Sequence, residues 1–446
     1  MRPTPASQRI GALAAAIGIV LIGSAAVPAP GPDLTVVHPV GDPAQDVPNV
    51  QAAVDLGGTV RLKATTVDGA PGVFDFGSNL PGGGFVDLSR DVEIEGEVAG
   101  THPTTISGGF APFRAWYDAP VDSRISDITF DAPGVAALYA SGSTGLEFTR
   151  NHVTDVVGLP EWLPGVDKGQ AVWVVGLDAV TGDILIADNL IEDVHADNGY
   201  GLALFGFSAD ARIERNEIRG VSTAGILAGV NLGAVAIVDN DIAPGPPRAP
   251  LPYGGGNGII IGNSLGGRAL VTDNAVECEN PYADGILIAA SAYYGDVQDG
   301  AVLTGNRVLM HDSMYGAISL VGSVTDTYVG RNRLGGNGAF AFANEPYLLP
   351  HEAVASTTFV GNNIAEFDSE VADLLFHENT VENAFFGAVE TIIDLGRGNW
   401  VSGAGTGAPP TSPGHAPPAP GAGGAAIGRT WDPVGAPILD GGTRDR

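Results

Sequence analysis

The chain has 446 residues, a formal net charge of −30 and 65 glycines. This acidity disfavours nucleic acids and anionic membranes as partners, and it disfavours polyanionic substrates unless a cation such as Ca²⁺ mediates the contact. The single cysteine, Cys278, excludes an internal disulfide and a cysteine metal cluster.

The N-terminus has the pattern of an export signal. Arg2 and Arg9 flank a basic start, the stretch 10–22 is apolar, and Ser24-Ala25-Ala26 offers small residues for cleavage. We therefore predict a Sec-type signal peptide over 1–26, with an uncleaved anchor as the alternative. The prediction implies a secreted, extracellular or cell-surface protein with no stable membrane span after cleavage.

The next segments predict an extended lead-in and a capping helix. Proline-rich residues 27–33 favour an extended chain. Asp46 is placed to cap a short helix that runs through Asp55, and Gly57-Gly58 would end it. We expect this helix to close the first coil of a solenoid, whose open end would otherwise expose strand edges and core.

A recurring Asn-x-apolar unit dominates the rest of the chain. Each unit has alternating apolar residues around a turn that holds the asparagine, and this period of two predicts strands. The shortest clean interval is 24 residues, which suits one coil of a solenoid. Stacked asparagines would bond to one another and to turn backbone. The predicted ladder consists of Asn151, Asn189, Asn216, Asn240, Asn274, Asn306, Asn332 and Asn362. Asn379 follows Asn362 by only 17 residues, so one of the two would be out of register.

These features resemble the right-handed parallel β-helix of the pectin-lyase-like superfamily. The resemblance covers residues 34–400 and includes the entry text from Val47 to Leu62, with Gly57-Gly58-Thr59-Val60. It implies an all-β solenoid with an N-terminal capping helix and an internal asparagine ladder, over a domain of 34–402. It does not imply an activity, because the superfamily includes several chemistries and some non-enzymes. No catalytic motif of the superfamily can be carried over to matching residues.

Five segments lengthen the repeat beyond a single coil. Such insertions often frame a binding face, although the sequence does not place them all on one side. They are 110–123, 158–170, 244–256, 291–300 and 343–355.

Polar residues after two successive ladder positions form the first candidate site. Glu279, Asp284, His311 and Asp312 would share one edge of the solenoid if Asn274 and Asn306 stack. Paired carboxylates at short distance support acid–base chemistry on a glycosidic bond. The same oxygens suit Ca²⁺, and a solvated polar corner is the structural alternative.

A second candidate follows Asn189 and supplies residues for substrate binding. His195, Asp197 and Tyr200 occupy the equivalent place three coils earlier, about 14 Å from Asn274 at the usual strand spacing. Turn chemistry is the alternative for this segment. Three further tyrosines complete the predicted binding set: Tyr282, Tyr293 and Tyr315.

One predicted sheet face argues against catalysis. With Ile226, Ile259 and Ile286 pointing inward, their neighbours Leu227, Ile260 and Leu287 point outward, and all three are apolar. That face would be covered by an inserted loop or would form a homo-oligomer interface.

Two functional hypotheses remain open from the sequence. The first is a β-helix that binds extracellular polysaccharide or a surface protein without catalysis. The alternative is a polysaccharide lyase or glycoside hydrolase that uses the carboxylate and histidine cluster. Residues 403–446, rich in Gly, Ala and Pro, are predicted to be a disordered tail.

Overall fold

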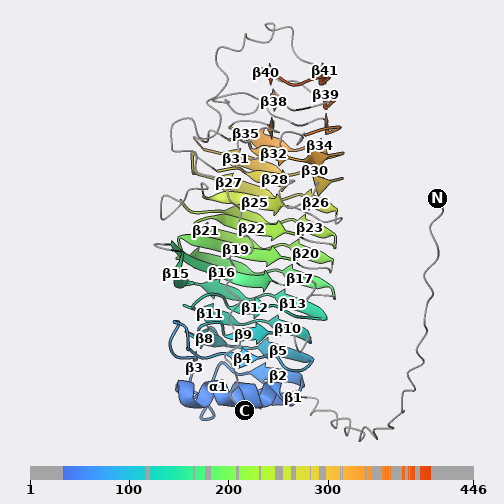
Figure 1. Cartoon of the computed structure of the whole chain (residues 1–446). Helices are drawn as coiled ribbons and strands as arrows, with labels where there is room; N and C mark the ends of the chain where they lie inside the picture. Colours follow the sequence, from blue (N-terminus) through green and yellow to red (C-terminus); the bar gives the residue numbers. More distant parts are fainter. Residues whose placement is uncertain are drawn as a thin grey trace, which may run out of the picture.

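The computed structural model is a parallel β-helix closed at its N-terminal end by a helix (Figure 1). From β2 to β36 each coil passes through sheet 1, sheet 2 and sheet 3 in turn and then returns to sheet 1. The right-handed coil agrees with the hand that parallel crossover connections adopt. The predicted fold class is confirmed. The described residues are 34–116, 121–163, 166–175, 182–206, 210–230, 233–246, 255–262, 268–281, 283–290, 298–311, 313, 315–336, 339–342, 354–360, 362, 374–376, 380, 382–386 and 392–402.

Sheet 1 is the longest of the three stacks and begins and ends the described coils. It contains β1 (Leu34–Val37), β2 (Gly58–Leu62), β5 (Val92–Gly96), β10 (Asp122–Ser126), β13 (Gly145–Thr149), β17 (Ile184–Ala187), β20 (Ala211–Glu214), β23 (Val235–Val238), β26 (Ala269–Thr272), β30 (Val302–Thr304), β34 (Tyr328–Gly330), β37 (Thr358–Val360), β39 (Ala384–Phe386) and β41 (Trp400–Ser402).

Sheet 2 follows sheet 1 within each coil. It contains β3 (Phe74–Asp75), β8 (Thr105–Ser107), β11 (Thr129–Asp131), β14 (His152–Thr154), β18 (Leu190–Val194), β21 (Glu217–Val221), β24 (Asp241–Ala243), β27 (Ala275–Cys278), β31 (Arg307–Met310) and β35 (Arg333–Gly335).

Sheet 3 closes the coil. It contains β4 (Val86–Asp87), β9 (Phe113–Ala115), β12 (Leu138–Ala140), β16 (Val166–Val175), β19 (Asn198–Phe205), β22 (Ala224–Gly229), β25 (Asn257–Gly262), β28 (Ile286–Ala290), β32 (Ile318–Gly322), β36 (Ala339–Phe342), β38 (Leu374–Phe376) and β40 (Ile392–Asp394), with β15 (Leu159–Leu163) antiparallel to β16. Two small pairs lie outside the stacks: β6 (Val98–Ala99) with β7 (His102–Pro103), and β29 (Gln298–Asp299) with β33 (Val324–Thr325).

The helix α1 (Pro43–Val54) lies across the N-terminal end, as predicted, but its N-cap is Asp42 rather than Asp46. The Asp42 side chain accepts a hydrogen bond from the backbone N–H of Ala44, and Pro43 suits the first helical position because its missing N–H is not needed there. Asp46 lies one turn later, fully buried, and its carboxylate accepts backbone N–H groups from the lead into the helix and from β3.

The predicted asparagine ladder is confirmed at the corner between sheets 1 and 2. Asn240 is typical: its side-chain amide donates to the carbonyl of Ile213 at 3.0 Å and to Oδ1 of Asn274 at 2.9 Å, and its own Oδ1 accepts the backbone N–H of Asn216 at 3.0 Å. The backbone N–H to Oδ1 bond recurs without interruption from Asn151 to Asn362. Asn362 is therefore in register, and Asn379 lies outside the described residues.

Near the C-terminal end, a second asparagine ladder stands at a different corner of the coil. Asn383 accepts the backbone N–H of Thr357 and is followed by Asn399, which accepts that of Asn383 at 3.0 Å. Both asparagines directly precede strands of sheet 1, so this shorter ladder stands at the corner between sheets 3 and 1. The sequence pattern of Asn-x-apolar did not distinguish the two corners.

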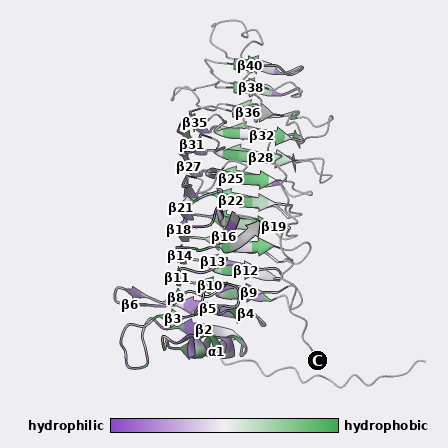
Figure 2. Ribbon diagram, turned by 60° about the vertical axis from the view of Figure 1, so that its left-hand side comes forward, coloured by the Kyte–Doolittle hydropathy of each residue, from purple (hydrophilic) through white to green (hydrophobic). Residues whose placement is uncertain are grey.

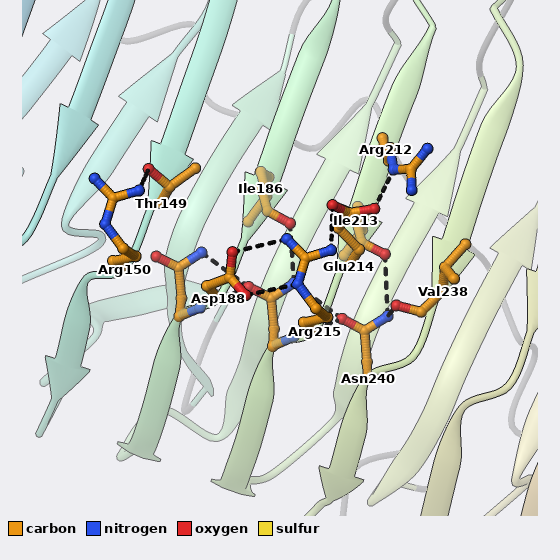
Figure 3. Close-up of polar contacts among 12 residues, drawn as sticks. Thr149, Arg150, Ile186, Asp188, Arg212, Ile213, Glu214, Arg215, Val238 and Asn240 are labelled. Atoms are coloured by element: carbon orange, nitrogen blue, oxygen red, sulfur yellow. Dashed lines mark hydrogen bonds and ion pairs between the residues drawn. The ribbon is translucent and has the colours of Figure 1, made fainter.

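A column of ion pairs runs outside the main ladder (Figure 3). The residue before each ladder asparagine from Asn151 to Asn332 has positive φ, including Arg150, Asp188, Arg215 and Asp239. Arg215 bonds Asp188 with both ends of its guanidinium, at 2.7 and 2.8 Å, and also contacts the buried Glu214. Hydrogen bonding from Arg215 holds the pKa of Asp188 below its usual value. These contacts join neighbouring coils and fix their register.

We expect the Asp188→Asn substitution to cost less than about 1 kcal/mol at neutral pH, because both members of the pair are substantially exposed. A lowered carboxyl pKa stabilises the folded state above the unfolded value of about 3.9 and loses that effect as pH falls through the folded pKa. The difference between the parent protein and the variant should therefore shrink below about pH 4, as measured by urea denaturation at several pH values. Asp239→Asn is the matched control, since Asp239 has the same positive φ, and no ion pair is recorded for it among the described residues.

Among the described residues, no helix is long and apolar enough to cross a membrane. The predicted signal peptide (1–26), lead-in (27–33) and tail (403–446) lie outside the described part of the chain.

Candidate functional site

The inserted segments all border sheet 3. Chain connectivity places 244–256 between a strand of sheet 2 and a strand of sheet 3, and it places 291–300 and 343–355 between sheet 3 and sheet 1. The segment 158–170 contains β15 and the start of β16, so it belongs to sheet 3 itself. The segment 110–123 is not purely an insertion, because its middle forms β9 and buries Phe113 in the core. Since insertions flank both edges of one sheet, the outer face of sheet 3 is the candidate functional surface.

One row of outward side chains runs along this face in register. Its members are the middle residues of apolar triplets such as Leu138-Tyr139-Ala140, whose flanking residues point into the core. The row is Asp87, Arg114, Tyr139, Trp173, Ala203, Leu227, Ile260, Leu287 and Ser319.

The C-terminal part of the row is apolar. Leu227, Ile260 and Leu287 form a cluster separate from the solenoid core, and their exposed fractions are 7%, 4% and 4%. Figure 2 shows the hydrophobic colouring along β22, β25 and β28. The predicted outward orientation is correct, and these side chains are already shielded within a single chain. Their role in a homo-oligomer stays a prediction.

Three aromatic side chains lie near the N-terminal end of the row, beside Asp87 and Arg114. Trp116, directly after β9, meets Tyr139 with ring centroids 5.6 Å apart, and Tyr139 meets Trp173 at 5.1 Å, both edge to face. We call Trp116, Tyr139 and Trp173 the aromatic row. Tyr139 and Trp173 pair on β12 and β16, and Trp116 lies two residues beyond Arg114, the partner of Tyr139 on β9, so the three rings run along the solenoid axis. Trp116 and Tyr139 are half-buried, whereas Trp173 is buried.

Charged groups frame the aromatic row at one end. The guanidinium of Arg114 bonds Asp87 at 2.9 Å and lies 4.9 Å from the Trp116 ring centroid. The indole N–H of Trp116 donates to the same Asp87 oxygen at 2.9 Å. Burial raises the pKa of Tyr139, so its hydroxyl remains a hydrogen-bond donor at neutral pH.

Lys168 frames the other end. Its amine lies 4.6 Å from the Trp173 ring centroid, at the foot of the β15–β16 hairpin. Burial lowers the pKa of Lys168 to about 8. Perturbed ionisable groups concentrate at functional sites, because chemistry and binding need charges that water does not fully solvate.

A second column of sheet 3 residues lies beside the row at the corner with sheet 2. Gln170 pairs with Tyr200, Tyr200 with Ala224, and Ala224 with Asn257. Gln170 is fully buried, and neither polar atom of its amide has a hydrogen-bond partner. Such a group in a native fold indicates a water or ligand contact.

Two predicted site residues fall on this column. Tyr200 packs against both apolar clusters of the outer face. Asp284 follows Asn257, whose Oδ1 accepts the Asp284 backbone N–H at 2.8 Å, and the buried Asp284 carboxylate accepts the Ser319 hydroxyl. The structure thus brings Tyr200 and Asp284 to one face, three strands apart.

His311 and Glu279 lie on the sheet 2 side of the corner, away from the Asp284 carboxylate. His311 directly follows β31 and bonds Glu277 on the preceding coil at 2.9 Å. Glu279 directly follows β27 and is exposed. The four residues predicted to share one edge are thus divided, as far as they are described, because Asp284 turns onto the outer face of sheet 3. Asp312 lies outside the described residues.

His195 occupies the place equivalent to His311 and makes the equivalent contact. It follows β18 and bonds Asp155 on the preceding coil at 2.8 Å. The hydrogen bond from His195 lowers the pKa of Asp155. A second pair, His152 with Glu192 at 3.1 Å, bridges the same two coils. These contacts connect coils, which accounts for the histidines structurally.

The other predicted binding residues give little geometry. Asp197 accepts the backbone N–H of Asp167 at 3.5 Å and so borders the Lys168 hairpin. Tyr315 is half-buried at the corner between sheets 2 and 3, where its backbone N–H donates to Ser313. Tyr282 and Tyr293 lie outside the described residues.

Metal and thiol chemistry find no support in the described part of the chain. No group of three or more His, Cys, Asp or Glu side chains there has the arrangement of a metal site. Ca²⁺ therefore stays a prediction. Cys278 is fully buried, and burial raises the pKa of its thiol, so it does not act as a thiolate near neutral pH.

Sequence reasoning missed four members of the site: Arg114, Tyr139, Lys168 and Trp173. The signal was present, since Tyr139 and Trp173 each stand between two small or aliphatic residues, as outward residues of a buried strand do. Only the folded structure shows that Tyr139 contacts both Trp116 and Trp173.

Comparisons with known proteins leave the family open. No protein-family model matches the chain, and no curated protein matches it either. Among solved structures, the A-module of the mannuronan C-5 epimerase AlgE6 from Azotobacter vinelandii aligns with 81% of this chain and 95% of its own length. The sequence identity is 15% and the TM-score 0.39, so we draw no argument about function from this similarity.

Proposed function

We propose that the protein is a secreted β-helix that binds an extracellular polysaccharide along the aromatic row of sheet 3. The observation that carries the proposal is the continuous edge-to-face contact of Trp116 with Tyr139 and of Tyr139 with Trp173 along the solenoid axis. Aromatic rings stack on the apolar faces of sugar rings, and a small number of polar groups then fixes orientation. Secretion rests on the export pattern of residues 1–26.

The polar groups around the row suit a glycan. Asp87, Arg114 and the Tyr139 hydroxyl offer acceptors and donors to sugar hydroxyls at one end. Lys168 offers a donor at the other end. The position of the insertions on both edges of sheet 3 supports a ligand that lies on this face.

Binding should be measured by calorimetry with the mature full chain on polygalacturonate, alginate, xylan and a mixed-linkage β-glucan. Trp116→Ala and Tyr139→Ala should each weaken binding of the preferred polymer roughly thirtyfold, since truncating a central aromatic anchor costs about 2 kcal/mol. Leu185→Ala, an outward substitution on sheet 1, is the matched control and should bind normally. Unchanged affinity in both aromatic variants, with normal circular dichroism, would contradict the proposal.

A second candidate is acid–base catalysis on the same glycan, favoured by Lys168. An amine with a pKa of about 8 is partly neutral near pH 7 and can accept a proton. New reducing ends and unsaturated products should be followed with the parent protein and with Lys168→Gln. Turnover that the variant loses while it still binds would establish this candidate. Absence of turnover across the panel would leave binding alone.

A further inference from the structure

The outer face of sheet 1 changes character along the solenoid. Over the strands from β2 to β20 its outward positions carry many charges: Arg61, Glu93, Glu95, Arg124, Glu147, Arg212 and Glu214. From β26 to β41 the same two rows carry no charge at neutral pH. We call these later positions the neutral strip: Leu270, Val302, Tyr328, Thr358, Ala384 and Trp400 in one row, and Thr272, Thr304, Gly330, Val360 and Phe386 in the other.

The neutral strip exposes large apolar side chains. Trp400 is 54% exposed, Leu270 39% and Phe386 37%, which are high values for such residues on an ordered sheet. Phe386 and Trp400 contact each other edge to face, with centroids 4.8 Å apart. Exposed apolar patches on a protein of this charge indicate an interaction surface.

The rings of Tyr328 and Trp400 are two separate aromatic contact points on the neutral strip. The Tyr328 ring lies along its own strand over Gly330, in the space that any larger side chain at 330 would occupy. Tyr328 and Trp400 belong to the same row, three strands apart, which is about 14 Å at the usual strand spacing. The row positions between them are Thr358 and Ala384, whose small side chains do not protrude between the two rings.

We infer that the neutral strip binds a second, uncharged polysaccharide chain, which runs along the solenoid axis across Tyr328 and Trp400. A chain of sugar rings offers apolar faces to the two aromatic rings and hydroxyls to Thr272, Thr304 and Thr358. The missing charge matches an uncharged polymer, whereas the surrounding acidic protein repels polyanions.

A second copy of this chain fits the strip less well as the occupant. The core of a protein interface is a continuous, closely packed apolar patch. Here Tyr328 and Trp400 are separated in their row by the small side chains of Thr358 and Ala384, so the two rings do not form one closely packed group. This site is separate from the aromatic row of sheet 3, and the two proposals stand or fall independently.

Sedimentation with microcrystalline cellulose and with chitin tests the inference on the mature full chain. We expect binding to at least one of these polymers, weakened about tenfold or more in Tyr328→Ala and in Trp400→Ala and abolished in the double variant. Tyr328→Phe and Trp400→Phe, which keep a ring, should bind within about threefold of the parent. Leu185→Ala, on the same sheet but outside the neutral strip, should bind these polymers normally.

Three outcomes would overturn the inference. One is no binding of the parent protein to either polymer. The second is equal binding by the parent and the double variant. The third is a solution dimer, detected by analytical ultracentrifugation, that the double variant loses, because the strip would then be an interface between copies. Melting curves and far-UV circular dichroism show whether each variant is folded. If a change at Trp400 unfolds the last coil, Tyr328→Ala still tests the neutral strip.

Discussion

Replacing Asn240 with alanine should destabilise the solenoid by roughly 3–5 kcal/mol, because several buried groups lose their partners at once. Asn216 loses the acceptor for its backbone N–H and for its side-chain amide, and the carbonyl of Ile213 loses its donor. Each stranded buried group costs about 1–3 kcal/mol, more than the net value of the bond itself. Urea denaturation followed by circular dichroism measures the loss.

The neighbouring Asp241→Ala substitution is the control for this experiment. Asp241 lies beside the ladder, but it is exposed, and within the described part of the chain its side chain makes one contact, a 3.8 Å ion pair with Arg219. We expect a change of less than about 0.5 kcal/mol there. Equal denaturation midpoints for the two variants would show that the ladder contributes no more than the surface around it.

Replacing Asp46 with alanine should loosen the N-terminal cap more than any other single change in α1. Its carboxylate accepts the backbone N–H of Val40 at 2.8 Å, of Gly41 at 2.9 Å and, across the coil, of Asp75 at 2.9 Å. Hydrogen bonds to a buried charged group are worth about 1.5–3 kcal/mol each, so the loss of three should cost more than about 4 kcal/mol. Hydrogen exchange should speed up at β1, α1 and β3 well before it does in later coils.

Asp42→Ala separates this role from ordinary helix capping. Asp42 is the true N-cap and is exposed, so its removal should cost about 1 kcal/mol. Asp46→Asn keeps one acceptor oxygen and should fall between the two alanine variants. If Asp42→Ala proved the more damaging change, the network around Asp46 would not be what holds the cap.

The fold was predictable because its evidence is local and repeated. Strand alternation and the regular asparagines such as Asn189 and Asn216 each appear many times, so one irregular interval does no harm. The cap at Asp46 was mispredicted because Asp42 and Asp46 both suit an N-cap by residue type. The distinction depends on Asp75, which is distant in sequence and comes beside the helix only after the first coil closes.

The candidate site was much less predictable, because it depends on register between coils of unequal length. Glu279, Asp284 and His311 belong to two neighbouring coils. The chain nevertheless turns a corner between Glu279 and Asp284, so Glu279 lies beside sheet 2 and Asp284 beside sheet 3. Conversely, Trp116 and Trp173 are 57 residues apart in sequence and still flank the same tyrosine. Composition shows that aromatic residues are present, but only strand pairing shows which of them form a row.

The constant spacing between strands gives the solenoid a fixed repeat distance along its axis. Along sheets 1 and 3, a polymer parallel to the axis meets one coil every 4.8 Å or so, a distance set by backbone pairing rather than by side chains. Gain or loss of a whole coil during evolution would therefore change the length of polymer that is recognised and leave each individual contact intact. Two ligands bound on different faces would meet the same repeat distance. The number of coils between Trp116 and Trp400 would fix their relative position along the axis.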